Sequence, residues 1–182
     1  MRRKRVHAVA AGVLVAVAAT LAVPGPSGAD PVVARDASVI VQWNQITQRT
    51  LAENAVAVPP SGLYYAFTAL AMYDAVVTIE GGYEPWAEQP AAQAHASPEV
   101  AAATAAYVVL RHFFPNSAAA LDADYAAALS DIPNGVGRVH GVRVGQAAAA
   151  TLIQLRTDDG RNAAVPQPGG PPFDAGEWQP TP

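Results

Sequence analysis

The sequence predicts an all-α fold, a bundle of about five helices after a cleavable signal peptide, with an irregular tail rich in proline and glycine. Apolar residues recur at helical steps of three and four through most of the chain. Proline and glycine interrupt these stretches and mark helix ends. We therefore divide the chain into a signal peptide at 1–29, a helical domain at 30–157 and a tail or linker at 158–182.

The N-terminus has the layout of a secretory leader. Residues 2–5 are all basic, residues 6–23 are uncharged, and small residues occupy positions Ser27 and Ala29. This order predicts cleavage after Ala29 and a secreted, extracytoplasmic protein. An uncleaved membrane anchor is the alternative, because the uncharged run just reaches the length that spans a bilayer.

Loss of the leader leaves a strongly acidic protein. Four of the eleven basic residues leave with it, so seven arginines and no lysine remain against fifteen acidic residues, a net charge near −8. Such a surface disfavours phosphate backbones, and we expect no nucleic-acid partner. The chain has no cysteine, which excludes disulfides and thiol chemistry. We also expect no second apolar run of membrane length, and therefore no membrane contact after cleavage.

Two helices are predicted in the first half of the domain. The first covers about 36–54 and is closed by Pro59-Pro60. Its apolar stripe comprises Val39, Ile40, Trp43, Ile46 and Leu51. The second begins near Ser61 as N-cap and stops at Gly81-Gly82. Its core-facing stripe comprises Leu63, Phe67, Leu70, Asp74 and Val77.

Asp74 is the one carboxylate in that stripe, and the stretch from Leu63 to Trp86 is expected to organise the chain around it. An unpaired buried carboxylate is costly, so Asp74 should accept hydrogen bonds from an arginine or from backbone N–H groups. The arginine candidates are Arg49, Arg111 and Arg143. We predict a structural lock, with an acid or base of a small enzyme as the alternative.

Three further helices are predicted. The third has Ser97 as N-cap, Pro98 at its first position and an acid at Glu99. The fourth carries an apolar face of Leu121, Tyr125, Leu129 and Ile132. The fifth covers about 136–157, and its small-residue face comprises Gly137, Gly141, Gly145 and Ala149. We expect another helix to approach that face closely, at a propensity cost of about 1 kcal/mol per glycine.

We find no pattern of a catalytic or metal-binding site in the tail or among the histidines. Residues after about Asp158 have no apolar periodicity and should be poorly packed. The three histidines of the mature chain, His95, His112 and His140, lack the spacing of metal ligands. Serine nucleophile elbows and phosphate-binding glycine loops are absent from the sequence. We predict no catalytic, cofactor-binding or metal-binding residue.

Several stretches together resemble a known family. These are Ala69-Leu-Ala-Met-Tyr-Asp-Ala-Val76, Gly82-Tyr-Glu-Pro85, Ser97-Pro-Glu99, Leu121 through Pro133, Leu155 through Gly160 and Gly176-Glu-Trp-Gln-Pro-Thr-Pro182. In this order they resemble the N-terminal half of secreted bacterial vanadium-dependent haloperoxidases. Those enzymes belong to the superfamily of type 2 phosphatidic acid phosphatases.

The resemblance implies an all-helical enzyme whose vanadate, or phosphate in the phosphatases, is held by a lysine, two arginines, a Pro-Ser-Gly-His segment and a histidine. All of these lie in the family's C-terminal half. Here Pro60-Ser61-Gly62 is followed by Leu63, and a second Pro-Ser-Gly at 26–28 lies in the leader. No active-site residue of the family is therefore carried onto this chain.

Three functions follow as expectations. The favoured one is the N-terminal portion of a haloperoxidase-like or acid phosphatase-like exported enzyme, inactive alone, whose partner is the missing C-terminal half of the same fold. The second is a standalone secreted helical binding or scaffold module, with a homo-oligomer also open. The third is a small unrelated enzyme that uses Asp74.

Overall fold

The structure is a computed structural model that describes residues 31–164 and 175–176. This part contains no strand, and its helices are α1 (Pro31–Glu53), α2 (Val58–Glu80), α3 (Pro98–Phe113), the 3-10 turn η1 (Pro115–Ser117), α4 (Ala118–Ser130) and α5 (Val136–Leu155). The prediction of an all-α bundle is confirmed. The predicted signal peptide at 1–29 and the Trp178 segment of the tail lie outside the described residues.

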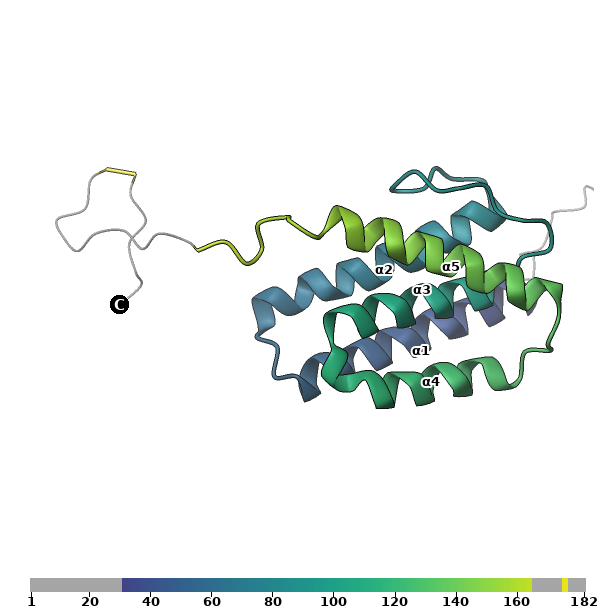
Figure 1. Cartoon of the computed structure of the whole chain (residues 1–182), viewed down its shortest axis with the longest axis horizontal. Coiled ribbons are helices and arrows are strands. Elements are labelled where there is room, and N and C mark those ends of the chain that lie inside the picture. The colour runs from purple at the N-terminus through teal and green to yellow at the C-terminus, as the bar shows by residue number, and fades with distance from the viewer. Residues whose placement is uncertain (1–30, 165–174, 177–182) are drawn as a thin grey trace, which may run out of the picture.

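Helix α3 is the centre of the bundle. It packs against all four other α-helices, with α1 and α4 on one side and α2 and α5 on the other (Figure 1). Every residue from Val100 to Ala106 is buried. The alanines among them let neighbours approach from several directions. We expected residues 63–86 to form the centre of the bundle, and that prediction is wrong, because α3 occupies the centre.

The N-cap of α3 is formed as predicted. The Ser97 side chain accepts a hydrogen bond from the backbone N–H of Val100 at 3.2 Å, and Pro98 and Glu99 occupy the first turn. The bond pairs one of the amide groups that every helix start leaves without an intrahelical acceptor.

Replacing Ser97 with alanine should lower the free energy of unfolding by about 1 kcal/mol, because that amide loses its acceptor. Ser61→Ala is the matched control, since the Ser61 hydroxyl donates to the Val58 carbonyl inside a helical turn and caps nothing. Chemical denaturation of both variants compares them, and equal losses would contradict the assigned cap.

Helix α2 begins earlier than predicted. Its N-cap is Ala57, which has an extended backbone and makes no side-chain cap, so the prediction of Ser61 as N-cap is wrong. Pro59 and Pro60 lie in its first turn and do not close α1, which ends at Glu53. Proline is favoured there because the first turn has no intrahelical acceptor for its missing N–H.

The boundaries of α4 and α5 also shift by a residue or two. Helix α4 ends at Ser130, so Ile132 lies half-buried just beyond the helix it was assigned to. Helix α5 ends at Leu155, two residues before the predicted end at Thr157. Leu121 and Leu129 are buried, as the pattern predicted.

Two expectations about α2 need correction. Its 23 residues are long and apolar enough to cross a membrane, so the expectation of no mature run of that length is wrong. One side of α2 lies in the core, where Phe67, Ala71 and Ala75 are almost completely buried. Leu63, assigned to the core face, is 45% exposed.

The glycine face of α5 packs directly on α3. A Cβ added at Gly141 would lie 2.7 Å from the Ser97 carbonyl oxygen, and one at Gly145 would lie 2.7 Å from the Thr104 Cβ. Both distances are too short for real contacts. The prediction that this face admits a close neighbour is confirmed.

The chain keeps contact with the bundle beyond α5. The Arg161 guanidinium lies 5.0 Å from the Phe113 ring centre and 5.9 Å from that of Phe67. It also bonds the Arg156 carbonyl and the Asp159 carboxylate. Packing therefore extends past Asp158, where we expected it to end.

Limited proteolysis should place the C-terminal edge of the protected core after Arg161. Replacing Arg161 with alanine removes its ring contacts and should move the first cleavage back toward Thr157. Asn162→Ala, at an exposed neighbouring position, should leave the cleavage site unchanged. Mass spectrometry of the fragments decides, and an unmoved site in Arg161→Ala would contradict the packing role.

Candidate functional site

Asp74 binds the loop that follows α2. Its Oδ1 accepts the backbone N–H of Trp86 at 2.6 Å, and its Oδ2 accepts the backbone N–H of Ala87 at 3.1 Å and the Gln89 side-chain amide at 3.2 Å. Asp74 is only 2% exposed. The prediction that backbone N–H groups would satisfy this carboxylate is confirmed.

The three arginines suggested as partners of Asp74 bond elsewhere. Arg49 pairs with Asp124 of α4, Arg111 pairs with Asp122 at 2.8 Å, and Arg143 donates to the Gln93 side chain at 3.0 Å. The loop amides replace them because Gly81 and Gly82, both with positive φ, turn the chain back along α2. The arginine alternative is wrong.

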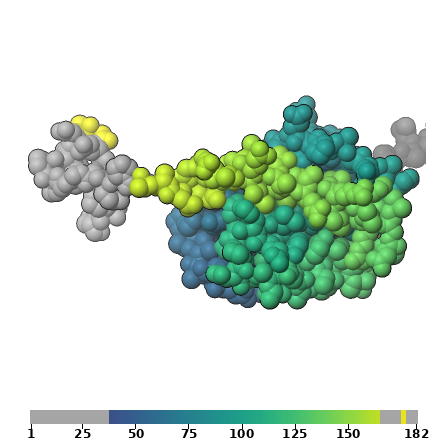
Figure 2. Space-filling model, viewed as in Figure 1, coloured from purple at the N-terminus to yellow at the C-terminus, as the bar shows by residue number. Residues whose placement is uncertain are grey.

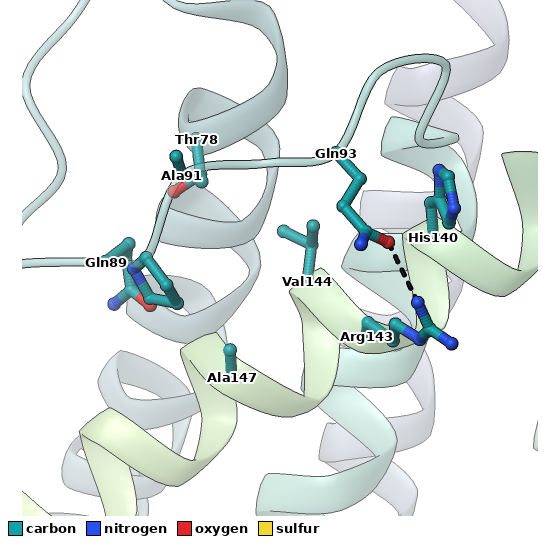
Figure 3. A pocket seen from close by; sticks show the side chains of 9 residues that line it. Thr78, Gln89, Ala91, Gln93, His140, Arg143, Val144 and Ala147 are labelled. Carbon is teal, nitrogen blue, oxygen red and sulfur yellow. Dashed lines mark hydrogen bonds between the residues drawn. The ribbon is translucent and has the colours of Figure 1, made fainter.

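This loop covers a pocket of about 200 Å³ between α2 and α5 (Figure 3). In the space-filling view the loop stands as a ridge beside α5 (Figure 2). The lining residues are Thr78, Gln89, Pro90, Ala91, Gln93, His140, Arg143, Val144 and Ala147. No carboxylate is among them.

The polar groups of the pocket are held at one end. His140 Nδ1 lies 2.9 Å from the Ala94 carbonyl oxygen, which fixes the ring, and Arg143 Nη1 donates to Gln93 Oε1. In Figure 3 Gln93 hangs from the loop between Val144 and Arg143, with its amide oxygen toward the guanidinium. Arg143 and the Gln93 NH₂ group therefore present hydrogen-bond donors in one place, while the His140 Nδ1–H is used on the Ala94 carbonyl.

Sequence reasoning missed this pocket. Residues Gln89 to Gln93 belong to an irregular loop with no periodic signal, and contacts with residues distant in the sequence, such as Asp74 and Arg143, fix where that loop lies. His140 and Arg143 are three apart on α5, a spacing that places both on one helix face and could have suggested a joint site.

The three described histidines lie in different elements. His95 has a positive φ in the loop, His112 packs edge-on to Phe113, and His140 lines the pocket. Within residues 31–164 and 175–176, no group of three or more His, Asp or Glu side chains is arranged to hold a metal ion.

Two arginines meet at the end of α5, a cluster that the sequence analysis did not foresee. Arg156 lies 5.3 Å from the Phe67 ring centre and 5.1 Å from that of Trp86, while Arg161 lies over Phe67 and Phe113. The Arg161 backbone N–H, and then its guanidinium, lower the pKa of Asp159. Through these ring contacts the residues after α5 pack against α2 and α3.

These arginines do not fit the vanadate set that the resemblance implies. A tightly held oxyanion needs several cationic donors that converge on one point. Arg49, Arg111 and Arg161 pair with aspartates, and Arg138 donates to the Leu129 and Ile132 carbonyls at 3.1 Å. Arg143 is the single cation of the pocket. We derive no vanadate chemistry from these residues.

Comparison of the chain with protein-family models, curated proteins and solved structures gave no match.

Proposed function

We propose that residues 30–157 form the N-terminal helical portion of an exported enzyme similar to vanadium-dependent haloperoxidases or to the related acid phosphatases. In this proposal the portion is a scaffold and is inactive alone. The vanadate or phosphate is bound by a second helical unit, which supplies the cationic residues.

The contact between Asp74 and the loop after α2 is the observation that carries this proposal. Two consecutive stretches of the resemblance in the described region are 69–76 and 82–85. Asp74 lies in the first and accepts the amides of Trp86 and Ala87, directly after the second. The two stretches therefore act as one structural unit.

The outer face of α2 is the surface on which we place the second unit. Gly62, Ala66, Ala69 and Tyr73 lie at steps of four, three and four and are all exposed. No charged residue occurs in α2 before Glu80 except the buried Asp74. An exposed helix face of this kind is typical of an interface.

The DNA downstream of the codon for Pro182 gives the first test. The proposal expects an open frame, in any register, that encodes a lysine, Arg-Pro and Pro-Ser-Gly-His. A downstream region without these elements in all three frames would contradict it and would favour a standalone helical module.

The interface is tested by co-purifying the chain with the segment encoded by that frame. Ala69→Glu places a charge on the outer face of α2 and should abolish co-purification while leaving the melting temperature of the isolated chain unchanged. Gln45→Glu, at an exposed position of α1, is the control and should co-purify normally. If Ala69→Glu instead only breaks a dimer of the chain itself, the surface is a homo-oligomer interface and the proposal fails.

A standalone binding module remains the second candidate, favoured by the pocket between α2 and α5. A small enzyme based on Asp74 is not favoured. Its carboxylate is buried and already accepts three hydrogen bonds, so it is poorly placed to exchange a proton with a substrate.

A further inference from the structure

We infer that the pocket between α2 and α5 is a binding site for a small aliphatic monocarboxylate. The inference does not depend on the proposed function. It rests on the distribution of hydrogen-bond donors and apolar surface in the pocket lining.

Donors dominate the polar end of the pocket. Arg143 uses one N–H on Gln93, and among the described residues no carboxylate lies within ion-pair distance of its guanidinium. The Gln93 amide oxygen accepts that bond, and its NH₂ group is a further donor. A ligand that accepts hydrogen bonds and carries negative charge suits this end, because the lining contains no acidic residue to repel it.

The charge of the ligand follows from the single cation. One guanidinium in a protein that is acidic overall neutralises one negative charge, so a monoanion fits better than a dianionic phosphate. A planar carboxylate also matches the fork of an arginine.

Most of the remaining lining is apolar, and Thr78 and Gln89 are its polar members. Ala91 of the loop lies across the pocket from Val144 and Ala147 of α5 (Figure 3), and Pro90 also lines the pocket. A volume of about 200 Å³ suits a chain of a few carbons. We therefore assign the carboxylate to Arg143 and Gln93 and the alkyl chain to Val144 and Ala147.

Titration of the full mature chain with butyrate, followed by ¹H–¹⁵N NMR, tests the assignment. Butyrate should shift the amide signals of Gln93, Val144 and Ala147 saturably, in the millimolar range expected for so small a ligand. Butylammonium, with the same alkyl chain and the opposite charge, should cause no saturable shift. Inorganic phosphate should bind at least tenfold more weakly than butyrate.

Two variant pairs complete the test. Arg143→Gln should weaken butyrate binding at least tenfold, whereas Arg111→Gln, which removes the same charge from an exposed ion pair outside the pocket, should not change it. Ala147→Leu should block the pocket, and Ala150→Leu, at an exposed position of α5, should not. No saturable shift with butyrate, equal binding of butylammonium or phosphate, or unchanged binding in Arg143→Gln and Ala147→Leu would each overturn the inference.

Discussion

Replacing Asp74 with alanine should lower the free energy of unfolding by about 3 kcal/mol, because three donors lose a buried acceptor. The variant would leave three donors without the carboxylate acceptor: the backbone N–H groups of Trp86 and Ala87 and the side-chain amide of Gln89. For a domain of this size, the melting temperature should fall by roughly 10 °C. Differential scanning calorimetry measures both quantities.

Two variants control for the general effect of losing an acid from α2. Asp74→Asn keeps one oxygen acceptor and should lose less stability than the alanine variant. Glu80→Ala removes an exposed acid at the end of the same helix and should change stability by less than about 0.5 kcal/mol. A melt of Asp74→Ala within about 1 °C of the wild type would contradict the locking role.

Replacing Gly145 with alanine should lower the free energy of unfolding by about 2 kcal/mol, the overpacking cost less the helix propensity gained. The new Cβ would overlap the Ala101 carbonyl oxygen and lie 3.0 Å from the Ala105 nitrogen. Both are backbone atoms of α3, which cannot rotate away as a side chain can. The helices would have to separate. Urea denaturation provides the measurement.

Gly62→Ala is the matched control for that prediction. Gly62 lies in α2, and a Cβ added there has no atom within 4 Å. Only the gain in helix propensity remains, so this variant should be more stable by about 0.5–1 kcal/mol. Stabilisation of both variants would contradict the close approach of α5 to α3.

Local signals in the sequence predicted the parts of the fold that depend on neighbouring residues. The Ser97-Pro98-Glu99 start of α3 and the glycine stop after α2 are formed as expected, since each is decided within one helical turn. The closely packed glycine face of α5 followed from its spacing of four.

The features that depend on distant contacts could not be predicted in the same way. Arg49, Arg111 and Arg143 were plausible partners for Asp74 by type alone, yet the loop amides lie closer because the chain turns back at Gly81. The central place of α3 depends on its small side chains meeting four other helices. The pocket forms only when an irregular loop is laid over α5.

Vanadate calorimetry tests most directly the proposal that this chain is a scaffold and that a second unit binds the vanadate. The purified chain should give no heat of tight vanadate binding and should not brominate a dye when peroxide and bromide are added, because its arginines do not converge on one oxyanion. The chain joined to the segment encoded downstream should do both. Micromolar vanadate binding by the isolated chain, or dye turnover above a vanadate-only control, would mean that a complete site exists within these 182 residues.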